Sequence, residues 1–108
     1  MPSLTKAQRA QLRQLAVDAH SRELTAALTD LYEEFGRWGG SETGAFDLNE
    51  IVHKFHDGIS RELYKRYVLG SVELGVIYAL QQGILGADEV DEGLIAALGM
   101  PSGVNAGG

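Results

Sequence analysis

The chain has 108 residues, which is enough for one domain with a single modest core but not for two. It contains no cysteine, so disulfides, a thiolate nucleophile and cysteine-based metal sites are excluded. The net charge is −6, and all Lys and Arg residues lie between Lys6 and Arg66 without forming an evident basic face. Nucleic acid is therefore not expected as a partner.

The first residues lack the apolar core of a signal peptide, and no run approaches the roughly 18 apolar residues that a membrane span needs. We therefore expect a soluble, cytoplasmic protein that does not enter a membrane. One helical domain is expected over residues 1–100. The C-terminal tail at 101–108, PSGVNAGG, has nothing to bury and is expected to be disordered.

The first predicted helix begins at Lys6, because Thr5 and Gln8 have the three-residue spacing of a capping box. It can continue to Phe35, since no Gly or Pro intervenes and leucines recur at helical spacing. The apolar phase slips near residues 20 and 21. One long helix, bent near His20 and Ser21, is the favoured interpretation, and the alternative is a new helix capped by Ser21.

The stretch GRWGGSETGA has neither the helical nor the strand period, which predicts the connection between the two longest helices. A short connection makes these helices antiparallel neighbours. Trp38, the only tryptophan, lies in or beside this connection. Two roles are open for it, covering the end of the core or anchoring an interface.

The second predicted helix begins at Leu48, because Asp47 can cap it and Glu50 completes a capping box. Phe46 and Ile51 have the spacing of a hydrophobic staple. Apolar side chains then recur at three- and four-residue steps as one core-facing stripe: Leu48, Ile51, Val52, Phe55, Ile59 and Leu63. This periodicity predicts an amphipathic helix that continues to about Val68.

A line of uncharged polar side chains runs beside that stripe. It consists of Asn49, His53, His56, Ser60, Tyr64 and Tyr67, which predicts a hydrogen-bonding margin of the apolar face. The other positions are charged and include acid-first pairs four residues apart, which is typical of a solvated helix face. Gly58, in the middle of this helix, predicts either a local bend or a point of close packing.

A third helix is predicted from Val72 to about Gln82. Gly70 ends the preceding helix and Ser71 can cap the new one. Its side chains are apolar nearly all the way round, so it is either the central helix of the domain or part of an oligomer interface.

The last predicted helix begins at Asp88 or a neighbour and ends at Gly99, just before Pro101. We find no internal repeat and no convincing strand pattern. The expected fold is all-α, a small bundle of three to four helices in which two long antiparallel helices are followed by two shorter ones.

The functional hypothesis is a small interaction or regulatory module without evident catalysis, which binds a protein partner and associates with itself. It rests on the apolar third helix, the small size, and Trp38 beside the glycine-rich connection. The predicted contacts are Trp38, Tyr64, Tyr67, Ile77 and Tyr78. No cofactor is expected under this hypothesis.

The alternative is a metal-binding helical protein. Glu50 and His53 form a Glu-x-x-His step, His56 and Asp57 follow within a turn, and Glu34 can approach from the first helix. Iron, manganese or zinc would lie at a subunit interface, because one chain supplies only one such step. Redox and hydrolytic chemistry both stay open. We favour the structural interpretation, in which Glu50 caps the helix and the histidines are ordinary semi-exposed groups.

Overall fold

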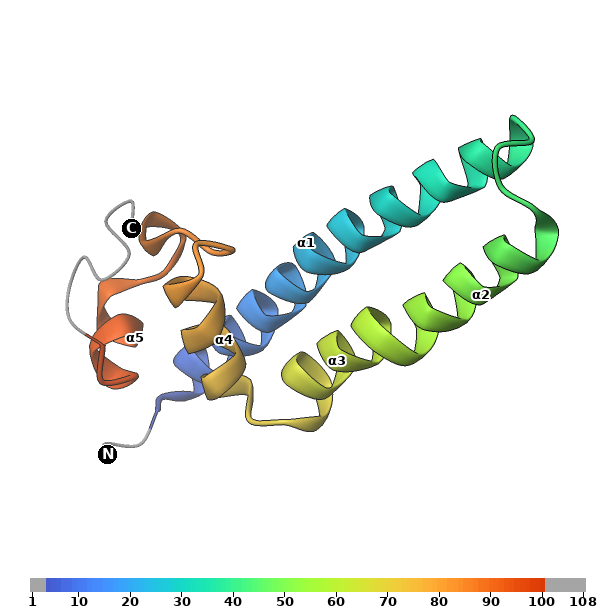
Figure 1. The fold of residues 1–108 in the computed structure, drawn as a ribbon. Coiled ribbons are helices and arrows are strands. Elements are labelled where there is room, and N and C mark those ends of the chain that lie inside the picture. Colours follow the sequence, from blue (N-terminus) through green and yellow to red (C-terminus); the bar gives the residue numbers. More distant parts are fainter. Residues whose placement is uncertain (1–3, 101–108) are drawn as a thin grey trace.

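The structure is a computed structural model that describes residues 4–100, so the predicted disordered tail lies outside the described residues. Five α-helices follow one another: α1 (Lys6–Gly39), α2 (Ala45–Phe55), α3 (Arg61–Tyr64), α4 (Val72–Gln81) and α5 (Glu92–Ala97) (Figure 1). Two π-helical segments, His56–Ser60 and Lys65–Leu69, continue α2 and α3. A 3₁₀ segment spans Ala87–Glu89. The described residues contain no strand, and the predicted all-α fold class is confirmed.

The first helix forms as one continuous element of 34 residues. Its capping box is present, because the Thr5 hydroxyl accepts from the Gln8 N–H and the Gln8 amide oxygen accepts from the Thr5 N–H. The helix extends four residues beyond the predicted end at Phe35, so Trp38 lies in its last turn. A glycine costs a helix only about 1 kcal/mol, which is too little to stop it where the backbone bonds continue.

The predicted capping box at the start of α2 is wrong. The helix begins at Ala45 and its N-cap is Gly44, whose carbonyl accepts from the Leu48 N–H one turn before the predicted cap could act. Asp47 therefore lies in the first turn, where a negative charge still stabilises the helix N-terminus. The predicted staple is also wrong, because Phe46 is 91% exposed.

The two π-helical segments change the predicted faces of the second helix. A π turn holds an extra residue and thereby rotates the side chains that follow it around the axis. Tyr67, predicted for the polar margin, is 4% exposed in the core, while Ile59 keeps its predicted apolar side and is 42% exposed. Nothing lies within 4 Å of a Cβ placed on Gly58, which marks a local irregularity of the helix without close packing.

A compact head is formed by residues 4–24 and 61–100. The buried side chains of its core come from α1, the chain around α3, α4 and the C-terminal segments: Leu12, Leu15, Ala16, Ala19, Leu63, Tyr67, Val76, Ala79, Leu80, Leu85, Val90, Leu94, Ile95 and Leu98. The Ser71 hydroxyl caps α4, as predicted. A Cβ on Gly75 would lie 3.1 Å from the Arg66 carbonyl oxygen, so α4 packs closely inside its own chain and is the central helix of the head.

The last helix begins later than predicted. The Glu89 carboxylate accepts from the Gly86 N–H and from Arg22, which holds Ala87–Glu89 as a 3₁₀ turn before α5 starts at Glu92. Its end agrees with the prediction, since Gly99 follows the helix in the left-handed conformation at a φ of 77°.

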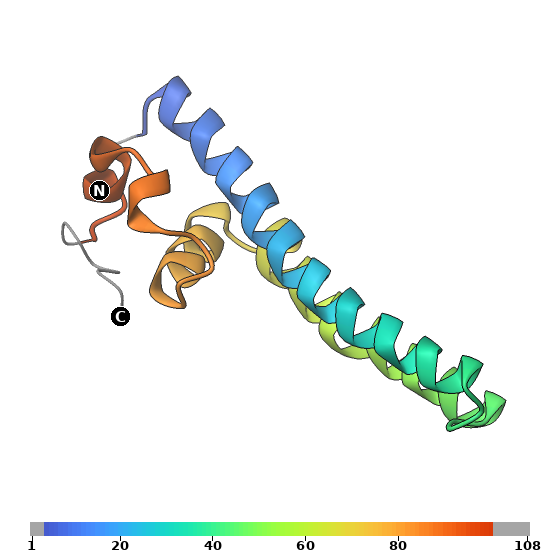
Figure 2. The same ribbon diagram turned by 90° about the horizontal axis from the view of Figure 1, so that it is seen from above.

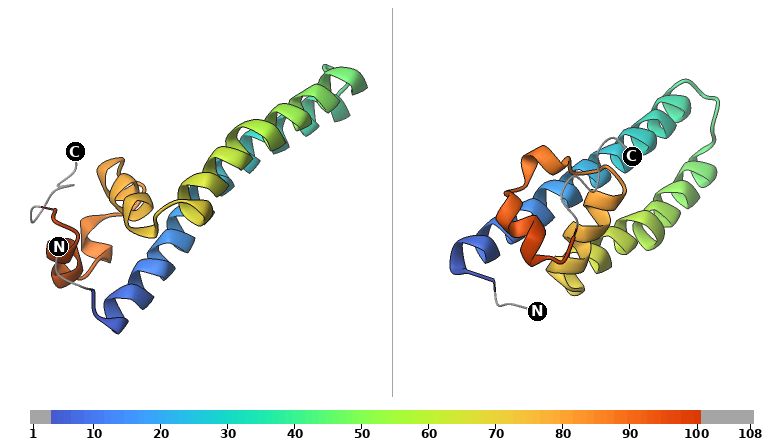
Figure 3. Two further views of the ribbon diagram at one scale, coloured as in Figure 1. Left: turned by 90° about the horizontal axis from the view of Figure 1, so that it is seen from below. Right: turned by 90° about the vertical axis from the view of Figure 1, so that its left-hand side faces the viewer.

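An arm of two antiparallel helical segments projects from the head. It consists of residues 25–60, which are the C-terminal part of α1, the turn, α2 and the first π-helical segment (Figures 1 and 2). The molecule measures 55 × 28 × 17 Å, and its radius of gyration of 17.4 Å exceeds the roughly 13 Å of a compact 100-residue domain. Figure 3 shows α4 and α5 gathered at one end of the arm. Within residues 4–100, no helix is both long and apolar enough to cross a bilayer.

Candidate functional site

The arm exposes apolar and aromatic side chains instead of burying them. Among the described residues, only one of the fifteen buried hydrophobic residues, Leu48, belongs to the arm. Six of the eleven exposed large hydrophobic residues lie on it: Leu28, Tyr32, Phe35, Trp38, Phe46 and Ile59. Since an exposed apolar surface is informative mainly where it is contiguous, its distribution over the two sides of the arm decides what it can do.

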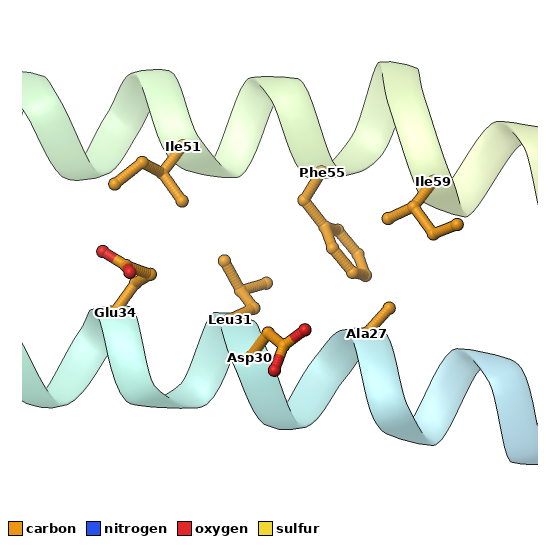
Figure 4. A pocket seen from close by; sticks show the side chains of 7 residues that line it. All are labelled: Ala27, Asp30, Leu31, Glu34, Ile51, Phe55 and Ile59. Atoms are coloured by element: carbon orange, nitrogen blue, oxygen red, sulfur yellow. The ribbon is translucent and has the colours of Figure 1, made fainter.

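One side of the arm has an apolar groove of about 310 Å³ between the two helical segments. Its walls are Ala27 and Leu31 from α1, and Ile51, Phe55 and Ile59 from the opposing segment (Figure 4). These side chains point toward one another from the two helices without filling the space between them. The groove is therefore an unfilled apolar surface that is open to solvent.

The rim of this groove is acidic on the α1 side, where Asp30 and Glu34 lie one turn apart. Arg37 donates to the Glu34 carboxylate at 3.0 Å, whereas Asp30 has no ion pair within residues 4–100. The arm carries seven acidic and two basic side chains, a formal charge of −5, while the head, with eight acidic and seven basic, carries −1. Five of the six net negative charges of the protein therefore lie on the arm that holds the groove.

The other side of the arm, here named the uncharged flank, consists of Leu28, Tyr32, Phe35, Val52 and His56. At about 100° per residue, the three α1 members lie roughly 120° around the helix from the side chains that line the groove. The other two, Val52 and His56, directly follow the groove residues Ile51 and Phe55. They therefore lie on the same side of the hairpin as the three α1 members. Tyr32 is 78% exposed and Leu28 is 45% exposed. None of these five is an acid, a lysine or an arginine.

Three residues of the predicted polar line lie together in the structure. His56, Ser60 and Tyr64 surround one shallow hollow of about 250 Å³, together with Arg61. The hollow extends the uncharged flank toward the head. Tyr67 does not belong to it, because the intervening π-helical segment turns that side chain into the core.

The five predicted contact residues do not form one surface. Trp38 is partly exposed at the far end of the arm, and Tyr64 is partly exposed at its base. Tyr67 is buried in the core of its own chain and does not belong to the predicted surface. Ile77 and Tyr78 are half-buried on α4, and the Arg66 guanidinium lies 4.0 Å from the centre of the Tyr78 ring.

A polar cluster that the sequence did not predict links α1 to the second π-helical segment within the head. The Tyr67 hydroxyl donates to the Glu23 carboxylate at 2.5 Å, and the Arg66 guanidinium donates to it at 3.1 Å. The His20 ring stacks on Tyr67 with 5.6 Å between centroids. Burial, and then the hydrogen bond to Glu23, raises the pKa of Tyr67 well above its ordinary value. Burial of the phenol and its hydrogen bond to Glu23 thus both favour the neutral form of Tyr67.

A second ion pair holds the C-terminal segments on α1. Arg22 donates to Glu89 at 2.9 Å and to the Ile84 carbonyl at 2.9 Å. The hydrogen bond from Arg22, and then that from the Gly86 N–H, lowers the pKa of Glu89 from 4.5 to about 2. The ion pairs of Glu23 and Glu89 have no local sequence signal, because Arg66 and Arg22 lie more than 40 residues away from them.

The candidate metal ligands are spread over the arm. Glu50, His53, His56 and Asp57 are exposed on α2 and the segment after it, and Glu50 lies 4.0 Å from the Lys54 ammonium group. Glu34 lines the groove from the α1 side and pairs with Arg37. Within residues 4–100, no three or more His, Asp or Glu side chains form a group that could hold a metal ion. A site shared between two chains stays a prediction.

Comparison with known proteins found no matching family model, no similar curated protein and no similar solved structure.

Proposed function

We propose that this chain is a non-enzymatic protein-interaction module that associates with itself through the uncharged flank of its arm. The single observation that carries the proposal is the exposure of Leu28, Tyr32 and Phe35 on a helical hairpin that has no core of its own. The head provides a folded base, and the arm provides the contact surface.

A hairpin of two helices is a single layer, and a stable helical domain needs a second layer against its apolar face. Two such hairpins from two chains make a four-helix bundle, in which each hairpin covers the other. The long, paired segments of α1 and α2 supply the length that this packing requires. Most of the stability of a helix in a protein comes from such packing, not from its intrinsic propensity.

The composition of the uncharged flank supports association with an identical surface. In a symmetric dimer each side chain lies close to copies of its own surface, so a charged face would bring like charges together. The five members of this flank avoid that cost. Aromatic residues are enriched and charged residues depleted at the centre of protein interfaces, and Tyr32 and Phe35 fit that pattern.

The proposed surface of self-association is the arm, not α4. The sequence left open whether that helix packs inside one chain or between chains, and Val76, Ala79 and Leu80 are buried within the head. The arm supports self-association more strongly, because its exposed aromatic side chains have no partner segment to cover them among residues 4–100.

The test is light scattering of the purified protein from about 1 to about 200 μM, since an association equilibrium moves with concentration. We expect a mass that rises toward twice the 11.6 kDa of one chain. Tyr32→Glu should keep the protein monomeric, because it places like charges across the contact. Phe46→Glu adds the same charge to an exposed aromatic position in the first turn of α2, off the uncharged flank, and should associate normally. A monomer throughout the range would contradict the proposal.

A further inference from the structure

The groove side of the arm presents a different chemistry from the uncharged flank. It combines an apolar cleft of about 310 Å³ with an acidic rim, and it belongs to a segment with a formal charge of −5. Self-association through the uncharged flank leaves this side uncovered. We propose that the groove binds one amphipathic helix of a partner protein, whose apolar stripe is flanked by lysine or arginine.

The shape of the groove fits a helix. Ile51, Phe55 and Ile59 recur at four-residue steps along one wall, and Ala27 and Leu31 do so along the other. Eight residues of an α-helix rise about 12 Å, so the groove accommodates roughly two turns of a bound helix. Helices that bind in such grooves insert apolar side chains at three- and four-residue spacing.

The rim specifies the charge of that helix. Asp30 and Glu34 are one turn apart on α1, so they can meet two basic residues that are also one turn apart on a partner. Arg37 already neutralises part of the Glu34 charge, which leaves Asp30 as the stronger contact. The charge of the whole arm also increases the rate at which a basic partner approaches.

The same charges argue against a second copy of this chain in the groove. Two grooves face to face would place the acidic rims of two segments of charge −5 together, which is unfavourable. The uncharged flank offers a contact between copies without that repulsion. The two sides of the arm therefore suit two different partners, an identical chain and a basic helix.

The probe is a fluorescently labelled helical peptide with leucine at three- and four-residue spacing and lysine on both flanks of that stripe. Two control peptides have glutamate in place of lysine, or the same composition in scrambled order. Anisotropy is measured with the full chain, at two salt concentrations. We expect saturable binding of the lysine peptide alone, and weaker binding at higher salt.

Variants locate the binding site. Asp30→Lys should weaken binding of the lysine peptide about three- to tenfold and improve binding of the glutamate peptide. Glu73→Lys makes the same change of charge on the exposed side of α4 and should leave the affinity within about twofold. Ala27→Phe fills the groove and should reduce binding without changing helix content, which circular dichroism measures.

Absence of saturable binding would overturn the inference. Equal weakening by Asp30→Lys and Glu73→Lys would also overturn it, because the peptide would then be following net charge and not the groove. These outcomes are separate from the test of self-association. A dimer that fails to bind the peptide contradicts only the inference, and a monomer that binds it contradicts only the self-association.

Discussion

The head and the arm use the same helix in opposite ways. The first half of α1 contributes Leu12, Leu15, Ala16 and Ala19 to the core, whereas the second half, beyond residue 24, contributes no buried residue. Both halves have apolar side chains at helical spacing. The difference is in what packs on them, since α4 and the C-terminal segments cover the first half and only α2 lies along the second. An amphipathic pattern therefore predicts that a surface is covered, but not which segment or chain covers it.

The largest difference is expected between two leucines, one in each region. Leu80 is fully buried in the head, and Leu80→Ala should reduce the free energy of unfolding by about 2–5 kcal/mol because it leaves a cavity. Leu28→Ala on the arm should cost about 1 kcal/mol or less when the protein is monomeric. Urea unfolding at low protein concentration measures both values. Equal losses would mean that the arm has a core of comparable quality.

Alanine substitutions at two glycines should change the stability of the protein in opposite directions. In the head, a Cβ on Gly75 would lie 3.2 Å from the Tyr67 ring, so Gly75→Ala should cost about 1–3 kcal/mol. At the base of the arm, Gly58 has open space, and Gly58→Ala should stabilise by about 0.5–1 kcal/mol through the unfolded state. The two midpoints of thermal unfolding should move in opposite directions. A loss of stability in Gly58→Ala would show that the π-helical segment requires glycine.

The polar cluster of the head is tested with a pair of tyrosines. Tyr67→Phe removes the hydrogen bond to Glu23 and leaves a partly buried carboxylate with one donor fewer, which should cost about 1–2 kcal/mol. Tyr64→Phe, three residues earlier and partly exposed, should change stability by less than about 0.5 kcal/mol. Chemical denaturation compares them. Similar values would mean that the hydrogen bond to Glu23 does not stabilise the head.

The smallest effect is expected from pH. The pKa of Glu89 is about 2 in the folded protein against an ordinary value of 4.5, so its pairing with Arg22 stabilises fully above pH 4.5. That contribution should be lost as the pH falls from 4.5 toward 2. In Glu89→Gln the unfolding free energy should change less over this range than in the wild type, whereas Glu73→Gln should behave like the wild type. Parallel pH profiles for Glu89→Gln and the wild type would contradict the assignment.

The sequence predicts the elements of the head and arm well where the signal is local. Thr5 with Gln8, Ser71 and Gly99 mark helix ends through bonds to near neighbours, and the structure contains all of them. The start of α2 was missed because two adjacent signals compete. The backbone carbonyl of Gly44 begins the helix before the Asp47 side chain can cap it.

The candidate surface was harder to predict, for two physical reasons. The π-helical segments rotate the residues that follow, so a fixed step of 100° places Tyr67 on the polar margin, whereas the structure buries it in the core. The polar cluster of the head also depends on pairs such as Arg66 with Glu23, which are distant in the sequence and carry no spacing signal. The groove could have been anticipated only in part, from the apolar spacing of Ile51 and Phe55.

The central claim is that the arm depends on partners for its cover while the head does not. Hydrogen exchange of backbone amides, measured as a function of protein concentration, tests this claim most directly. At low concentration the amides of residues 25–60 should exchange through openings of much lower free energy than those of α4. Raising the concentration should slow exchange on the arm and leave α4 unchanged. If both regions were equally protected at the lowest concentration and the protection did not depend on concentration, the claim that the arm needs a partner would be contradicted.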